Sequence, residues 1–254
     1  MQTQLGLEKC LPFINSEFKP WIRLSPCSPQ TSLPLSLTIS RQSGSGAHVI
    51  ADKLAEYLQV CAPDPSLPWM VFDRNLVERV LDDHHMPQRF ARFMPEDRVS
   101  EIADVLDELL GAHPPSSVLV QQTSETILRL AQRGHVVLIG RGANILTSHL
   151  NSVFHVRLVG SLAKRIAHVQ EAFGLAKRPA IELIQKEDRG RERYLKKYFG
   201  KDVDDAQLYH LVINTDLVDY EEAARFIGET ALKVIRPISD PIHDSRPPRQ
   251  RFLT

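Results

Sequence analysis

The chain has 254 residues, of which 43% are hydrophobic and 24% are charged, and this composition is typical of a globular domain with a sizeable core. Its 31 basic and 31 acidic side chains cancel, so net charge gives no reason to expect nucleic acid or an anionic membrane as a partner. No apolar run approaches the ~18 residues of a membrane span, and the N-terminus lacks the basic-then-apolar order of a signal peptide. The three cysteines show no metal-ligand spacing, and a sparse, odd number favours reduced thiols and a cytoplasmic protein.

The two ends of the chain differ from its middle. Residues 1–34 indicate an N-terminal extension and linker, in which apolar side chains favour a short helix that packs on the domain or meets a partner, followed by a stretch rich in Pro and Ser. Residues 237–254 carry four prolines and little periodicity, which predicts a disordered tail. Residues 35–236 remain as one domain.

Within this domain, apolar β-prone runs alternate with segments of helical spacing. The expected strands are residues 35–39, 69–72, 135–139, 153–159 and 211–213. The expected helices are residues 47–58, 74–82, 97–110, 117–133, 161–172, 177–198 and 219–235, with an irregular stretch at 83–95. Because strands that alternate with helices form parallel sheets, this order predicts an α/β fold with a doubly wound, five-stranded parallel sheet.

The first strand leads through a polar turn, residues 40–46, into an amphipathic helix. This is the layout of a phosphate-binding loop, because glycines let backbone N–H groups turn inward and a helix N-terminus presents unpaired donors to an anion. The match to G-x-x-x-x-G-K-[ST] is partial. Gly46 is the last glycine, but Arg41 stands at the first glycine. Ala47 and His48 replace the lysine and the hydroxyl that follows it. An ordinary strand-to-helix turn explains this stretch equally well.

Polar residues also follow other expected strands. In parallel α/β sheets, ligands bind beyond the carboxyl ends of the strands. Asp73 follows the second strand, Arg141 lies between two glycines after the third, and residues 214–216 (Asn-Thr-Asp) follow the fifth. A guanidinium placed there suits two-pronged contact with a phosphate. A structural ion pair with a carboxylate is the alternative for Arg141.

A highly charged segment, residues 186–197, contains three arginines at alternate positions, Arg189, Arg191 and Arg193. On a regular helix Arg189 and Arg193 share one face, and Arg191 points away. Charge runs of this kind are usually solvated helix surfaces. The functional alternative is a mobile, arginine-rich lid that closes over a polyphosphate.

Together these stretches resemble the cytidylate kinase-like family, a branch of the P-loop nucleoside monophosphate kinases, over roughly residues 35–235. The resemblance rests on the loop at 37–46 and on VFDRNLVERV, VVLIGRGAN, KEDRGRERYLKKYFGKD and LYHLVINTD. It implies a five-stranded parallel sheet of order 2-3-1-4-5 with a helical lid. It also implies phosphoryl transfer from ATP to CMP or dCMP with Mg²⁺, so the expected partners are nucleotide substrates.

The resemblance also implies roles for individual residues. Asp73 and the lid arginines Arg189, Arg191 and Arg193 would be catalytic, and Arg79 and Arg141 would hold the acceptor phosphate. The nucleotide-binding loop residues would be Arg41, Gln42, Ser43, Gly44, Ser45, Gly46, Ala47 and His48.

The chain also departs from the family pattern. The loop lysine is Ala47, the hydroxyl expected to bind Mg²⁺ is His48, and Ile139 stands where an aspartate precedes the glycine-arginine pair. The sequence identifies no metal ligand, and Arg41 is a candidate for supplying the lost positive charge. Two functions therefore stay open: a phosphotransferase of the nucleotide-kinase type, and a catalytically silent module that binds nucleotide or phosphate. The acceptor and the oligomeric state stay open as well.

Overall fold

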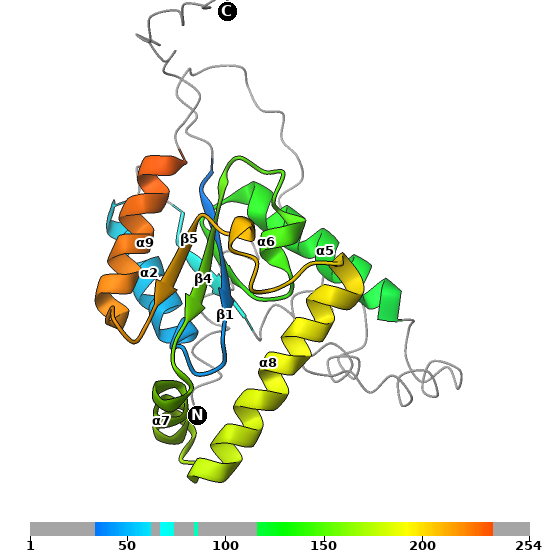
Figure 1. The fold of residues 1–254 in the computed structure, drawn as a ribbon. Helices are drawn as coiled ribbons and strands as arrows, with labels where there is room; N and C mark the ends of the chain where they lie inside the picture. The colour runs from blue at the N-terminus through cyan, green and yellow to red at the C-terminus, as the bar shows by residue number, and fades with distance from the viewer. Residues whose placement is uncertain (1–33, 62–66, 74–83, 86–115, 236–254) are drawn as a thin grey trace, which may run out of the picture.

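The computed structural model describes residues 34–61, 67–73, 84–85 and 116–235. Five parallel strands form one sheet in the order β2-β3-β1-β4-β5 (Figure 1). Their bounds are Ser36–Arg41 (β1), Met70–Phe72 (β2), Val136–Ile139 (β3), Val153–Val159 (β4) and Leu211–Asn214 (β5). The prediction of a five-stranded parallel sheet of order 2-3-1-4-5 is confirmed.

The helices fall on both faces of this sheet. Their bounds are Ala47–Cys61 (α2), Ser116–Arg133 (α5), Ala143–Leu146 (α6), Leu162–Phe173 (α7), Lys177–Phe199 (α8) and Tyr220–Val234 (α9), with a short 3₁₀ helix at Ala206–Leu208 (η2). In Figure 1, α2 and α9 lie together on one side of the sheet, and α5 and α6 lie on the other. Among the helices that the structure describes, none is both long enough and apolar enough to cross a membrane.

The alternation of side chains along β1 explains how the sheet is packed. Leu37 and Ile39 point into a core that α2 and α9 cover, whereas Ser36 and Thr38 are buried on the opposite face. The opposite face stays apolar near β2 and β3, where α5 packs. Over β1 and β4 it carries hydrogen-bonded polar side chains instead, such as the Ser36 hydroxyl that donates to Ala131 O at 2.8 Å.

The carboxyl ends of β1 and β4 point toward α7 and the first half of α8 (Figure 1). The helix α8 starts beside α7, beyond the ends of the strands, and runs back toward the side of the sheet that α5 and α6 cover. A small apolar cluster joins the two helices, with Ile166 and Val169 of α7 against Ala180 and Ile184 of α8. The open ends of the central strands are therefore bounded by this helical pair.

Several predicted boundaries were off, mostly by one residue; α2 continues to Cys61 instead of ending at residue 58, and the end of β1 was also misplaced. The strand β1 continues through Ser40 and Arg41, which pair with Arg157 and Leu158 of β4, so the turn begins at Gln42. Several other predictions lie outside the described residues: the extension up to residue 33, the helices at 74–82 and 97–110, most of the stretch at 83–95, and the tail at 237–254. The domain limits at 35 and 236 stay predictions.

Candidate functional site

The turn between β1 and α2 has a shape that only glycine can give it. Gly44 and Gly46 have φ values of 82° and 79°, in the left-handed region that side chains rarely adopt. A Cβ on Gly44 would lie 2.6 Å from Arg165 O, and one on Gly46 would lie 2.4 Å from Tyr220 Cζ. The backbone therefore packs against α7 and α9 on one side and leaves its other side toward solvent and the helix N-terminus.

Hydrogen bonds from the neighbouring strand fix this turn. The Gln42 N–H donates to Leu158 O at 3.0 Å, and the Gln42 side-chain oxygen accepts from Gly160 N–H at 3.0 Å. The Ser45 N–H closes the turn by donating to Gln42 O at 3.2 Å. The Ser45 hydroxyl is buried and has no hydrogen-bond partner among the described residues. A buried hydroxyl without a partner costs stability, and a water or a bound group near the loop would relieve that cost.

A cavity of about 460 Å³ opens in front of this loop. Three arginines line it, Arg41, Arg141 and Arg191, each from a different part of the chain. Its far wall is mostly apolar and comes from α7 and α8: Val169, Ala172, Phe173, Leu183 and Ile184. The remaining lining residues are Gln42, Ser43, Gly44, Ser45, Gly46, Ala47, His48, Val49, Asp73, His168 and Glu187. One cavity thus joins a positively charged end to an apolar wall.

The structure brings most of the predicted site residues to this cavity. All eight loop residues, 41–48, line it together with Asp73, Arg141 and Arg191. Arg189 and Arg193 do not line it, because they are exposed on the outer face of α8. Arg79 lies outside the described residues.

The phase of α8 explains why Arg191 differs from its two neighbours. The inward face of this helix carries Ile184, Asp188, Arg191 and Leu195, which follow the spacing of four, three and four residues along one helix stripe. Arg189 and Arg193 lie about 200° away from Arg191 at ~100° per residue, so they face solvent. The exposed Arg193 Nε donates to Arg189 O at 3.3 Å.

Asp73 links the ends of two strands to the start of α2. Its Oδ1 is 3.6 Å from Arg41 Nη2, and its Oδ2 is 3.0 Å from His48 Nε2. The side chains of Arg41 and Asp73 are 14% and 15% exposed, so solvent screens this ion pair only in part. His48 is largely exposed at the mouth of the loop. The charge of Arg41 is thus held beside the loop from the position of the missing first glycine.

Arg141 reaches the cavity through an unusual backbone. It has a φ of 59° and lies between Gly140 and Gly142, whose φ values are 80° and 67°. A Cβ on Gly142 would lie 2.5 Å from Phe199 Cε2, so the backbone here packs directly against the end of α8. A left-handed arginine costs roughly 1 kcal/mol or more. The strain places a guanidinium at the carboxyl end of β3.

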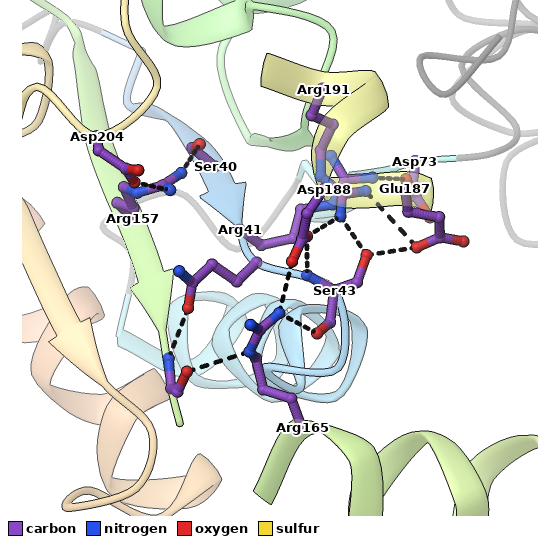
Figure 2. A network of polar contacts seen from close by, with 12 residues as sticks. Ser40, Arg41, Ser43, Asp73, Arg157, Arg165, Glu187, Asp188, Arg191 and Asp204 are labelled. Atoms are coloured by element: carbon purple, nitrogen blue, oxygen red, sulfur yellow. Dashed lines mark hydrogen bonds and ion pairs between the residues drawn. The ribbon is translucent and has the colours of Figure 1, made fainter. Parts of the chain in front are cut away.

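Sequence reasoning missed a cluster of charged residues that joins the loop to α7 and α8 (Figure 2). The Ser43 N–H donates to Asp188 Oδ1 at 2.8 Å, and the Ser43 hydroxyl donates to Glu187 Oε2 at 2.5 Å. Arg165 Nη1 donates to Ser43 O at 3.1 Å and to Asp188 Oδ2 at 2.6 Å. Arg191 Nη2 donates to Asp188 Oδ1 at 2.6 Å and also reaches the Ser43 hydroxyl.

This cluster is strongly polarised. Burial by itself would raise the pKa of Asp188, but the hydrogen bonds from Ser43 N–H, Arg165 and Arg191 outweigh it and lower that pKa below its ordinary value. Asp188 is therefore a carboxylate at neutral pH. The two arginines are buried, with side chains that are 11% and 10% exposed.

A second missed residue, Arg157, lies one strand further along. It is buried in β4, where Nη1 donates to Ser40 Oγ at 3.0 Å and Nη2 donates to Asp204 Oδ1 at 2.5 Å. The Tyr209 hydroxyl also reaches Ser40 Oγ, at 3.3 Å. A charged residue inside the apolar strand VFHVRLV was the available signal. Arg157 fixes the segment after α8 onto the sheet beside the loop.

The described residues were also tested as a site for Mg²⁺. They contain no group of three or more His, Cys, Asp or Glu side chains that could hold a metal ion by themselves. Mg²⁺ is usually bound through one or two carboxylates together with substrate phosphates and water. Asp73 lines the cavity beside the loop and fits this minimal requirement.

The chain is similar to one family model, two curated proteins and one solved structure. The family model described as "Cytidylate kinase-like family" matches residues 36–217. Among curated proteins, the cytidylate kinase of Thermoplasma acidophilum is 24% identical over 119 residues, which are 46% of this chain and 62% of that protein. A uronate isomerase of Corynebacterium glutamicum is 29% identical over 115 residues, 45% of this chain and 22% of that protein. The matches thus span less than two thirds of either relative. The crystal structure of an uncharacterized protein from Eubacterium ventriosum is similar at a TM-score of 0.56 and 18% identity, over 78% of this chain and 98% of that one, and supports the fold alone.

Proposed function

The chain belongs to the cytidylate kinase-like family, and on that premise we propose that it is a phosphotransferase that moves the terminal phosphate of ATP to a nucleoside monophosphate. CMP and dCMP are the first acceptors to test, because the family and one curated relative carry the name of cytidylate kinase. The same proposal places the protein in the cytoplasm, where both nucleotides are available.

One observation carries the proposal. The loop at residues 42–46 turns two left-handed glycines toward the N-terminus of α2, in front of a cavity lined by Arg41, Arg141 and Arg191. Backbone N–H groups at a helix N-terminus bind phosphate, and guanidinium groups neutralise its charge in a two-pronged way. Phosphoryl transfer depends on positioning and charge neutralisation, and these groups supply both.

The charged and loop residues have distinct roles in this proposal. The residues Arg41 to His48 hold the phosphates of ATP, and Arg141 holds the acceptor phosphate, together with Arg79, which lies outside the described residues. An oxygen of the acceptor phosphate forms a bond to the γ-phosphorus while the bond to the β,γ-bridging oxygen breaks and ADP leaves. Arg191 stabilises the charge on the transferring group, and Arg189 and Arg193 join it only when α8 moves. Mg²⁺ would enter with the nucleotide, neutralise phosphate charge, and be held by Asp73.

The apolar wall suits the rest of a nucleotide. A phosphate held at the loop leaves its nucleoside within reach of α7 and α8, where Phe173 is 57% exposed although it is large and aromatic. Aromatic rings and aliphatic side chains bind a planar base by stacking and by burying apolar area. The ligand we expect is therefore a phosphate joined to a flat, partly apolar group rather than a free inorganic anion.

The test is a screen of nucleoside monophosphates as acceptors with ATP and Mg²⁺, read as acceptor-dependent ADP release. Turnover with at least one acceptor, lost in Gly46→Val, supports the proposal. ADP release that no monophosphate increases would contradict it.

A second function has one specific observation in its favour. The lysine of the phosphate-binding loop is Ala47, and Arg191 is already paired with Asp188 at 2.6 Å. These features suit a protein that binds a nucleotide without turning it over and acts as a sensor. The two functions differ in their use of Mg²⁺, because only a kinase needs the metal to neutralise phosphates during transfer. ATP affinity that does not change with Mg²⁺, together with no turnover, would favour the sensor.

A further inference from the structure

Near the start of the loop, two carboxylates and two arginines gather around Ser43. Four donors converge at Ser43: its backbone N–H, its hydroxyl, and the guanidinium groups of Arg165 and Arg191 (Figure 2). Asp188 accepts from Ser43 N–H and from both arginines, and Glu187 accepts from the hydroxyl.

The donor set has the chemistry of a phosphate site. It combines a loop N–H, a hydroxyl and two buried guanidinium groups, which are the groups that proteins use to hold a doubly charged phosphoryl group. Two carboxylates supply the same charge and a similar set of acceptor oxygens. The charges of Arg165 and Arg191 balance those of Asp188 and Glu187, so the cluster is neutral as it stands.

The position of the cluster relates it to the nucleotide. Ser43 belongs to the loop and lines the same cavity as the N-terminus of α2, and Glu187 and Arg191 line that cavity as well. A polyphosphate that lies along the loop from the helix N-terminus thus runs toward Ser43. Its last phosphate would meet two carboxylates at close range, and like charges at such distances repel strongly.

We propose that Ser43, Arg165 and Arg191 form the binding site for the terminal phosphoryl group of the nucleotide, and that Asp188 and Glu187 occupy this site as an internal anion until the nucleotide displaces them. This inference rests on the proposed nucleotide binding at the loop. Displacing the carboxylates releases α8 from the loop and turns Arg165 and Arg191 toward the phosphate. Binding of a triphosphate and movement of α8 are then one event.

The inference predicts that the wild-type protein binds ATP more weakly than its loop permits. A ligand that binds only the open form loses affinity in proportion to the fraction of protein that is open. Asp188→Asn removes the competing charge and keeps an oxygen that can accept from Ser43 N–H. We expect this variant to bind ATP–Mg²⁺ about tenfold more tightly than wild type or better. AMP, which does not extend to Ser43 when bound at the loop, should gain less than the triphosphate.

The experiment is calorimetric titration of wild type and four variants with ATP–Mg²⁺ and with AMP. Glu192→Gln is the matched control, because Glu192 is an exposed acid on the same helix. Glu187→Gln should change affinity in the same direction as Asp188→Asn, and Asp188→Glu, which keeps the charge, should bind ATP as wild type does. Circular dichroism and thermal unfolding show whether each variant is folded.

The outcomes separate this inference from the proposed function. Tighter ATP binding by Asp188→Asn and Glu187→Gln, but not by Glu192→Gln, supports the internal anion. The inference is overturned if wild type binds ATP and the folded Asp188→Asn variant binds it equally or more weakly. In that case nucleotide binding at the loop still stands. Failure of wild type and all variants to bind ATP would instead reject the loop as a nucleotide site, and the inference with it.

Discussion

The buried side chain of His155 should make the folded protein less stable in mild acid, and the size of this loss follows from its surroundings. It is 5% exposed on β4, where its Nδ1 lies 2.9 Å from Thr38 Oγ1 and its backbone N–H donates to His210 Nδ1 at 2.9 Å. Burial, and then the neighbouring His210, lower the pKa of His155 from 6.5 to about 4. Burial also lowers the pKa of His210, whose Nδ1 can accept this hydrogen bond only while the ring is neutral.

The sign and size of this change in folding stability follow from the linkage between proton binding and folding. Between pH 6.5 and 4 the unfolded chain binds a proton at residue 155 and the folded protein does not, so stability is full above pH 6.5 and falls as pH decreases through this window. At about 1.4 kcal/mol per pKa unit, His155 accounts for about 3 kcal/mol over the whole window and roughly 2.5 kcal/mol by pH 4.5. The lowered pKa of Asp188 acts only below its ordinary value of 3.8, outside this window.

The assay is denaturant unfolding at pH 7 and pH 4.5. His155→Gln, which keeps a hydrogen-bonding group but does not titrate, should lose roughly 2.5 kcal/mol less than wild type on the same change of pH. The substitution also lowers stability at pH 7, and the difference between the two pH values removes that offset. Equal losses in wild type and His155→Gln would refute the assignment of the acid sensitivity to His155.

Three further predictions concern the site. Gly46→Ala should weaken ATP binding at least about tenfold, because its Cβ meets Tyr220 at a φ of 79°. The control is Gly174→Ala, which has a φ of 65° and open space around it; it should cost only about 1 kcal/mol of stability and leave titration with ATP unchanged. Equal ATP affinity in both variants would contradict this prediction. Arg141→Lys keeps the charge but not the planar fork, so we expect about tenfold weaker binding of monophosphates in the same titration, and wild-type affinity would make the arginine structural. Arg191→Ala should reduce acceptor-dependent ADP release about 10³-fold. The control is Arg178→Ala, since Arg178 is 91% exposed on the same helix. Normal turnover in Arg191→Ala would exclude α8 from the reaction, whereas Arg189→Ala and Arg193→Ala show whether the exposed arginines contribute when α8 moves.

The fold was predictable because its signals are local. Each strand is a short apolar run, and each described helix has a stripe of apolar residues, such as Ile50, Leu54 and Leu58 on α2. Strand order, by contrast, came from the family resemblance, since periodicity does not say which strands are neighbours. The end of β1 was misplaced because Ser40 and Arg41 are polar, although both continue the ladder with β4.

The candidate site was predictable only where glycine marks it. Gly44, Gly46 and the pair around Arg141 are recognisable in sequence because their backbone needs are local. The cluster at Ser43 was not recognisable in the sequence, because Asp188 lies 145 residues further along the chain. Its sequence neighbourhood is that of a solvent-exposed charged helix, where an acidic residue is expected to pair with a nearby base. One signal was available: Ile184, Asp188, Arg191 and Leu195 share a helix stripe, which places Arg191 rather than Arg189 or Arg193 on the inward face.

Backbone strain does not by itself locate this site, and the strand β3 shows why. His135, with a φ of 58°, follows Gly134 and precedes the N-terminal end of β3, and Arg141, with a φ of 59°, follows its C-terminal end. At the first end the strain serves the sheet, because His135 N–H donates to Leu35 O at 2.8 Å and His135 O accepts from Met70 N–H at 2.9 Å.

At the other end of β3, the same backbone conformation places a guanidinium beside a cavity. That cavity also contains the buried Ser45 hydroxyl without a partner among the described residues, and it borders the anion site at Ser43 that carboxylates fill. Folding alone gives no reason to gather a strained cation and an unsatisfied hydroxyl at one edge of the sheet, since each costs stability. Their coincidence at the mouth of one cavity is a reason, independent of any relative, to place the proposed phosphate site at this edge of the sheet.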